Sequence, residues 1–216
     1  GNIFVTLAKK AVIGHVDIDM LAGPSEILIV ADDSANPTYL AADLLSQAEH
    51  DPLACAILIT DSERVANAVG EEIEVQLAQL PRKEIAGTSL QQAGKIILAK
   101  DMPTVIEMAN LSAPEHLEIM TKAPFEIMPY IRNAGAMFLG AYSPEPLGDY
   151  YAGPNHVLPT SGTARFFSPL GVDSFVKKSS FLYYTEAALR EAKDDIVKLA
   201  ETEGLTAHAN SIKVRF

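Results

Sequence analysis

The run Ile27-Leu28-Ile29-Val30-Ala31, followed by a helix-type pattern over residues 37–50, decides the fold class of this chain. All residues of the run are apolar, which is typical of a strand buried on both faces of a parallel sheet. In the segment that follows, Leu40, Leu44 and Ala48 recur at every fourth position, as on one face of an amphipathic helix. A strand followed by such a helix is the repeating unit of an α/β fold.

The same alternation continues along the chain. Further compact apolar runs predict strands at residues 56–60, 95–100 and 136–140, and helix-type patterns predict helices at 62–80, 102–110, 124–133 and 185–203. Between them, residues 141–169 are rich in Gly and Pro and predict a long ordered loop, while residues 212–216 predict a terminal edge strand. The sequence therefore predicts a mainly parallel sheet with helices on both faces, plus a small C-terminal helical segment.

Composition excludes several classes of function. Among 216 residues, 17 Lys and Arg face 28 Asp and Glu, and this formal charge of −11 argues against binding nucleic acid or an anionic membrane surface. No apolar run reaches the ~20 residues of a membrane helix, and no basic segment with an apolar block marks a secretion signal. The single cysteine, Cys55, excludes a disulfide framework and a multi-cysteine metal site. We expect a cytoplasmic protein.

Two polar clusters lie at the ends of predicted elements. Gln47 and His50 are three residues apart, so they are neighbours on one helix face and can converge on a ligand. The alternative is that His50 merely interacts with the helix dipole. Glu115 and His116 follow a predicted helix end and can supply two general bases with different pKa values, unless they belong to an ordinary solvated turn.

Three further polar residues come later in the chain. Asp149 lies in the Gly/Pro-rich segment, where an Asp is more often a turn residue than a ligand. Glu203 lies at the negative end of the last predicted helix, an unfavourable place for a carboxylate, and His208 follows five residues later. Asp149 and His208 form, together with Gln47 and His50, an oxygen- and nitrogen-rich set suited to zinc or a similar divalent metal, although no spacing selects it.

Familiar catalytic motifs are missing. The sequence contains no Gly-x-Gly-x-x-Gly, no His-Glu-x-x-His and no Gly-x-Ser-x-Gly. The usual dinucleotide fingerprint, zinc-protease chemistry and serine hydrolysis therefore have no direct support.

Six stretches, in order along the whole chain, resemble the histidinol dehydrogenase family. They are Gly1-Asn2-Ile3-Phe4-Val5-Thr6, Ala22-Gly23-Pro24-Ser25-Glu26, Ser46-Gln47-Ala48-Glu49-His50-Asp51, Ala113-Pro114-Glu115-His116-Leu117, Gly148-Asp149-Tyr150 with Gly153-Pro154-Asn155-His156, and Glu203-Gly204-Leu205 with Ala207-His208. The resemblance implies a zinc-dependent, NAD-linked enzyme that oxidises L-histidinol through L-histidinal to L-histidine in histidine biosynthesis. It also implies an incomplete Rossmann-like fold and a homodimer whose sites draw residues from both subunits.

The resemblance also implies roles for particular residues. By motif, the zinc ligands are Gln47, His50, Asp149 and His208, and the substrate contacts are Ser25, His116 and Glu203 alongside those ligands. His116 is implied to take the alcohol proton as hydride leaves, and Glu115 to activate the water that attacks the aldehyde. Asn2 is the one residue here that matches a position for binding NAD.

Family members are about twice as long as this chain, so the resemblance implies a fragment. Residues 1–24 are then the tail of a second nucleotide-binding-like domain, 25–170 half of a Rossmann-like domain that carries the zinc site, and 171–216 a helical tail that crosses to the dimer partner. Two alternatives stay open. In the first, the chain is a zinc- and histidinol-binding module without redox activity. In the second, it is a metal-assisted hydrolase that uses the Glu115–His116 pair.

Overall fold

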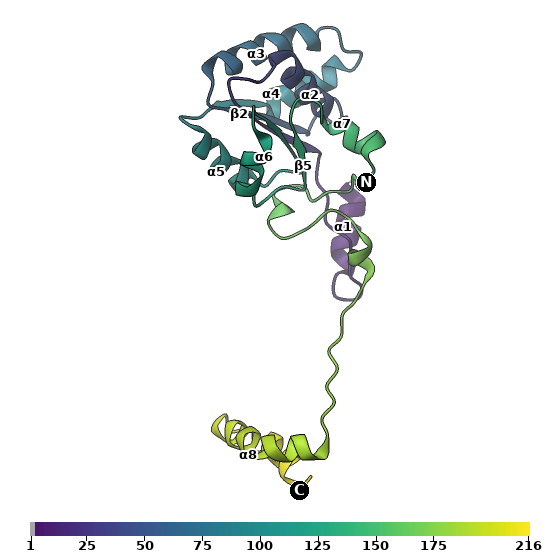
Figure 1. Ribbon diagram of the computed structural model, residues 1–216. Coiled ribbons are helices and arrows are strands. Elements are labelled where there is room, and N and C mark those ends of the chain that lie inside the picture. The colour runs from purple at the N-terminus through teal and green to yellow at the C-terminus, as the bar shows by residue number, and fades with distance from the viewer. Residues whose placement is uncertain (1–2) are drawn as a thin grey trace. The chain divides into compact units, whose positions relative to one another are not determined.

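A five-stranded parallel sheet forms the centre of the first of two compact units (Figure 1). The computed structural model describes residues 3–216, and the units are Gly1–Phe175 and Val176–Phe216. The strands are β1 (Glu26–Ala31), β2 (Cys55–Thr60), β3 (Lys95–Leu98), β4 (His116–Met120) and β5 (Ala136–Leu139), in the order β3-β2-β1-β4-β5. This is the order of a Rossmann sheet that lacks its sixth strand, which confirms the predicted fold class.

Helices cover both faces of the sheet (Figure 1). α2 (Pro37–Ala48) and α3 (Glu63–Leu77) cover one face, and α5 (Met102–Ser112) covers the other together with the short α6 (Pro124–Ile127). α4 (Lys83–Ala93) packs against α2. The sheet is therefore buried in its centre, but its outer strand β3 has exposed side chains, so the prediction that residues 95–100 are buried on both faces is wrong.

The helices begin where the sequence offers a cap. The Asn36 side chain accepts a hydrogen bond from the Thr38 N–H at the start of α2, and Ser62 does the same for Val65 at the start of α3. Asp101 caps α5 through the Thr104 N–H. Side-chain oxygens at this position satisfy backbone donors that the first helical turn leaves free.

The strand β4 and the helix α4 are among the elements that the sequence patterns did not predict. Along β4, Leu117 and Ile119 pack into the core beneath α5, whereas His116 and Glu118 alternate onto the face that α2 covers. These two polar residues interrupt the apolar run that indicates a buried strand. α4 carries few buried apolar residues, and its sequence shows no clear helical stripe.

The segment expected to be a long loop contains short helices. They are α7 (Glu145–Leu147), the π-helical turn η2 (Gly148–Ala152) and η3 (Thr163–Arg165). The helix expected at 124–133 is likewise shorter, because α6 passes into the 3₁₀ turn η1 (Met128–Tyr130). Three-residue helices leave no periodic pattern in a sequence, so an irregular segment was the natural prediction.

Beyond the sheet, the first unit also holds α1 (Ile3–Val12) and the 3₁₀ turn η4 (Val172–Phe175). The predicted division at residues 24 and 170 stays a prediction. No helix within residues 3–216 is long and apolar enough to cross a membrane.

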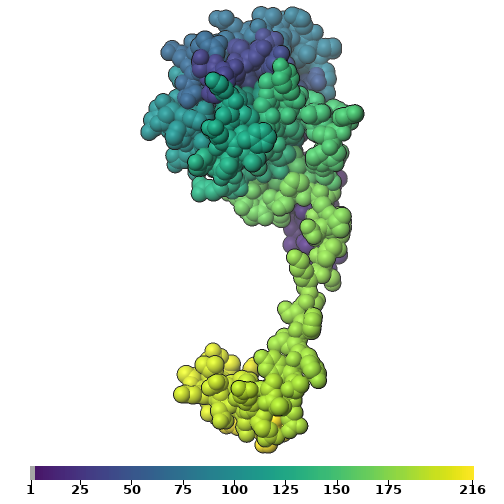
Figure 2. Space-filling model, in the orientation of Figure 1, coloured from purple at the N-terminus to yellow at the C-terminus, as the bar shows by residue number. Residues whose placement is uncertain are grey.

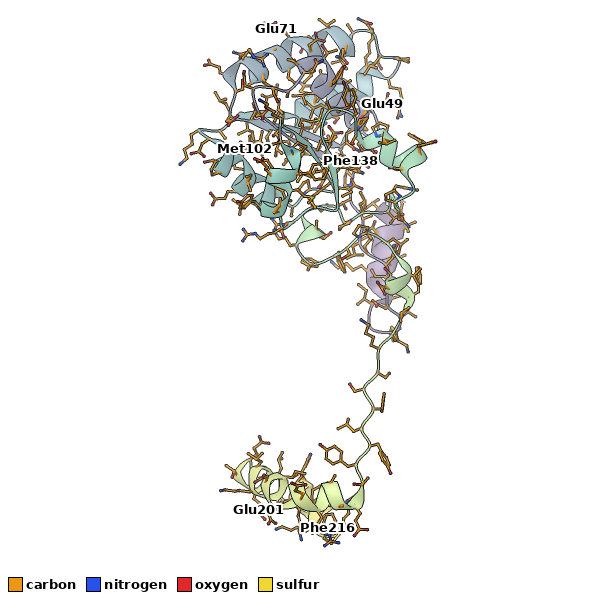
Figure 3. The ribbon with its side chains drawn as sticks, in the orientation of Figure 1. Glu49, Glu71, Met102, Phe138, Glu201 and Phe216 are labelled. Atoms are coloured by element: carbon orange, nitrogen blue, oxygen red, sulfur yellow. The ribbon has the colours of Figure 1, made fainter. Side chains whose placement is uncertain are left out.

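The second unit is a helical hairpin of α8 (Glu186–Thr202) and α9 (Thr206–Lys213), drawn in yellow in Figure 2. The predicted edge strand at 212–216 is wrong, because Ile212 belongs to α9. Gly204 turns the chain between the helices with a positive φ of 73°. The C-terminal ring of Phe216, labelled in Figure 3, packs under the Arg190 guanidinium, 4.5 Å from its centroid.

Candidate metal and acid–base site

The Glu115–His116 pair lies at the amino edge of the sheet, where β4 and β1 begin. The Glu26 N–H donates to Glu115 Oε2 over 2.8 Å, and His116 Nδ1 lies 2.9 Å from the Glu26 carbonyl oxygen. Glu115 and His116 are only 6% and 5% exposed. The alternative of a solvated turn is therefore wrong, because the pair enters a buried strand.

Backbone geometry brings the pair into place. Ala113 turns the chain from α5 into β4 with a positive φ of 50°, a conformation that a side chain rarely adopts. Gly135 then lies so close that a Cβ there would be 2.5 Å from the Glu115 carbonyl oxygen. The turn before β4 is thus held tightly against the start of β5.

The surroundings of His116 favour a neutral imidazole with one free nitrogen. A carbonyl can only accept, so Nδ1 carries the proton in the bond to Glu26 and Nε2 keeps its lone pair. Nε2 lies 3.7 Å from Glu145 Oε1. Burial lowers the pKa of His116, although the nearby charge of Asp149 opposes this shift. Such a nitrogen can accept a proton near neutral pH.

Glu145 and Asp149 complete a cluster with His116. Ligand atoms of the three side chains lie within 4.8 Å of one another, a spacing that can hold a metal ion. Asp149 was predicted as a ligand, whereas Glu145 was missed between two prolines. Its distance of four residues from Asp149 was the available signal, since such residues share a helix face.

Helix α2 faces this cluster with a second set of polar residues. Gln47 is 1% exposed, and its Oε1 is buried without a hydrogen-bond partner. Buried acceptors are almost always satisfied, so this atom fits a metal ligand, and amide oxygens are accepted by divalent cations. The exposed His50 lies two residues beyond the end of α2, and a positive charge on it would lower the pKa of His116.

Two carboxyl groups of the site, Glu115 and Glu145, have raised pKa values. Burial first, then the charges of Glu26, Glu145 and Asp149, raise the pKa of Glu115 to about 8. Burial and Asp149 raise the pKa of Glu145 to about 7. A bound divalent cation would offset this repulsion and favour the charged carboxylates. The chemistry of this donor set therefore fits a metal.

A cavity of about 390 Å³ opens beside His116 and Asp149. Its other walls are mostly apolar, formed by Phe125, Met137, Phe138, Leu147 and Leu158, and His156 also lines it. Phe138 is labelled in Figure 3. An apolar pocket with a few converging polar groups is typical of a site for a small molecule. Sequence reasoning had assigned no role to His156.

Ser25, a further predicted site residue of the first unit, is not part of this cluster. Ser25 lies just before β1, next to Glu26, and its carbonyl accepts from the Cys55 N–H. Glu203 ends α8 and His208 lies in α9, both exposed in the second unit, so their roles stay predictions. Asn2 lies outside the described residues.

The opposite, carboxyl edge of the sheet carries a different set of groups. Asp32 follows β1, and its Oδ2 accepts from the Lys122 N–H beyond β4 over 2.9 Å. Open α/β sheets bind nucleotides at this point, where the strand order reverses. A carboxylate that occupies the backbone donors there repels phosphate, so the described residues do not fit a dinucleotide at this edge.

The fold and the site define an α/β protein with a buried acid–base and metal-type centre at the amino edge of an incomplete Rossmann-like sheet. A sequence model described as histidinol dehydrogenase matches residues 1–216. The chain belongs to the histidinol dehydrogenase family.

Relatives agree with this assignment. Histidinol dehydrogenase from Clostridium acetobutylicum is 64% identical over 216 residues, and that from Aquifex aeolicus 57% identical over 215; each match covers 100% of this chain and 50% of the relative. The crystal structure of histidinol dehydrogenase from Elizabethkingia anophelis superposes with a TM-score of 0.93 at 44% identity, over 100% of this chain and 50% of that one. The chain thus spans about half the length of the relatives it matches.

Proposed function

We propose that this chain carries the catalytic centre of a zinc-dependent, NAD-linked dehydrogenase that oxidises L-histidinol through L-histidinal to L-histidine. The observation that carries the proposal is His116, whose free Nε2 faces a cluster of metal-type ligands beside a small-molecule cavity. The names of the relatives supply the substrate. Histidinol has an imidazole and an amine, which are good ligands for zinc.

The proposed zinc ligands are Gln47, His50, Asp149 and His208. The orphaned Oε1 of Gln47 supports the first, and the position of Asp149 in the cluster supports the third, whereas His50 is proposed on its motif. His208 is proposed on its motif alone. When bound, zinc would orient the amino alcohol and polarise its oxygen.

Two bases are proposed for the two oxidation steps. His116 Nε2 takes the hydroxyl proton of histidinol as its carbon loses hydride. Glu115 then takes a proton from the water that attacks the aldehyde carbon. Glu115 Oε2 is held by the Glu26 N–H, which leaves its other oxygen to accept from water. Ser25 and Glu203 are proposed as further substrate contacts.

The cofactor and the assembly are proposed on the resemblance. When bound, NAD would accept the hydride that the substrate carbon loses in each of the two oxidations, although the described residues offer no dinucleotide site at the carboxyl edge. We assign its contacts to Asn2 and to the part of the relatives that this chain does not cover. We also propose a cytoplasmic homodimer in which residues 171–216 cross to the partner.

A second function is favoured by the half-length match. Without the cofactor contacts, the chain would be a zinc- and histidinol-binding module without redox activity. The test is to add histidinol, Zn²⁺ and NAD to the chain, and to follow NADH absorbance together with histidinol binding by calorimetry. NADH formation supports the dehydrogenase, and zinc-dependent binding without NADH supports the module. Absence of both, or turnover of a simple ester instead, contradicts both proposals.

A further inference from the structure

Glu118 is a fully buried carboxyl group that the proposed chemistry does not use. It occupies the middle of β4 with 0% exposure, on the face that α2 covers. Its Oε1 accepts a hydrogen bond of 2.9 Å from the backbone N–H of Glu145, the first residue of α7. A buried acid usually needs a functional or structural reason, because burying it without partners costs several kcal/mol.

This hydrogen bond connects the sheet to the segment that carries Glu145 and Asp149, and it spans 27 positions of the sequence. The other backbone hydrogen bonds described for residues 143–148 are local, such as those from Leu147 to Pro144 and from Ser143 to Gly140. Gly148 contributes packing, since a Cβ there would lie 2.8 Å from the Phe138 ring. Glu118 therefore joins β4 to the turn that presents Glu145 and Asp149 to His116.

The second oxygen of Glu118 faces another acid. The Oε2 atom of Glu118 is buried and accepts no hydrogen bond within the described residues. The Asp43 carboxyl group of α2 lies close to the Glu118 side chain. Two carboxyl groups can bond to each other only when a proton lies between them. The Glu145 N–H thus holds one oxygen of Glu118, and the Asp43 carboxyl group lies near the other.

We propose that Glu118 is a positioning residue, which is held by Asp43 and fixes the α7 turn so that Glu145 and Asp149 lie against His116. The part of this inference that concerns metal affinity rests on the proposed function. The part that concerns the α7 turn rests on the hydrogen bonds alone.

Three variants of the chain separate positioning from simple burial. Glu118→Gln keeps an oxygen for the Glu145 N–H and supplies an N–H to Asp43. Glu118→Leu has a similar size but removes both bonds. The matched control is Ser89→Ala, which removes a buried 2.9 Å hydrogen bond to the Ala54 carbonyl, outside the cluster.

The first readout is amide hydrogen exchange in the metal-free chain. We expect the Glu145 amide to exchange at least tenfold faster in Glu118→Leu, with the Leu117 and Ile119 amides unchanged, and to stay as slow as in the original chain in Glu118→Gln and Ser89→Ala. The second readout is Zn²⁺ affinity, where Glu118→Leu should lose about ten- to hundredfold, as is typical for partners behind metal ligands, and Glu118→Gln should restore it.

The inference is overturned if the Glu145 amide exchanges as slowly in Glu118→Leu as in the original chain. It is also overturned if Glu118→Gln fails to restore slow exchange. If the original chain binds no Zn²⁺, the proposed metal site fails, but the exchange result still decides the positioning role. If Glu118→Leu does not fold, Asp43→Ala takes its place. It should speed exchange of the Glu145 amide in the same direction, and unchanged exchange there overturns the inference.

Discussion

The two edges of the central sheet use acidic residues in opposite ways. At the carboxyl edge, Asp33 accepts from Ser62 and Arg64, and Asp101 accepts from Thr104, and these bonds lower the pKa of both acids. At the amino edge, burial raises the pKa of Glu115 to about 8 and that of Glu145 to about 7. Hydrogen bonds favour the charged form of the acids at the carboxyl edge, whereas burial and neighbouring charges disfavour the charged form of the acids near His116.

This difference indicates which edge of the sheet carries the candidate site. Acids that follow a strand cap the next helix or close the turn, so their charge is stabilised by donors of the fold itself. Around His116, by contrast, Glu115 precedes β4, while Glu145 and Asp149 come after β5 and lie against the same imidazole, and these acids repel one another. Groups with perturbed pKa values in a cleft are typical of functional sites. The candidate site therefore lies at the amino edge of the sheet, and not at the carboxyl edge, where nucleotides usually bind.

The largest effect expected at the amino edge is on the aldehyde step. Glu115→Gln should lower histidinal oxidation by about 10²–10⁴-fold, the usual contribution of a general base, because glutamine cannot take a proton from water. Oxidation of the alcohol should be less affected. The two half-reactions are compared through NADH formation, and equal losses in both would contradict the assigned role.

The second effect concerns the metal. Asp149→Ala should weaken Zn²⁺ binding by more than the ten- to hundredfold loss typical of an outer partner, because it removes a proposed direct ligand. Asp33→Ala is the matched acid at the other edge and should leave Zn²⁺ affinity unchanged. Titration calorimetry measures both. Equal losses of Zn²⁺ affinity in the two variants would contradict a metal site at the amino edge.

The third effect is a pH dependence of stability in the metal-free chain. Glu115 has an ordinary pKa of 4.5 and a folded value of about 8, so between these values the folded chain binds more protons than the unfolded one. The free energy of unfolding should therefore fall as pH rises from about 4.5 to about 8. Urea titrations of Glu115→Gln should show a shallower fall, and an equally steep fall would contradict the raised pKa. Asp101→Asn should leave the slope between these pH values unchanged, because the lowered pKa of Asp101 places its titration below this range; any stability it loses should disappear as pH falls from the ordinary Asp pKa through the lowered one.

The smallest effect lies at the carboxyl edge. Asn36→Ala removes the side-chain cap of α2 and should lower the free energy of unfolding by about 1 kcal/mol, with Zn²⁺ affinity unchanged. Thermal and denaturant unfolding measure the first, and titration calorimetry the second. A large loss of Zn²⁺ binding would show that the edges are coupled.

The sequence predicted the parts of this fold that follow regular patterns. The strand that begins at Glu26 and the helix that begins at Pro37 were found because apolar periodicity marked them. β4 was missed because His116 and Glu118 serve the site from within the sheet, and such residues break the local pattern. Glu145 was missed although its spacing of four residues from Asp149 was a usable signal, because its other partners, His116 and Glu118, come from the distant strand β4. The roles of Gln47, His50, Asp149, Glu203 and His208 came from motifs, and all of them stay predictions.

The most direct test of the account is anomalous diffraction at the zinc absorption edge from crystals of this chain grown with Zn²⁺. The account predicts a peak at the amino edge, with Gln47, His50 and Asp149 directed at it and His116 beside it. A peak at the carboxyl edge, or those three side chains directed to separate surfaces, would contradict it.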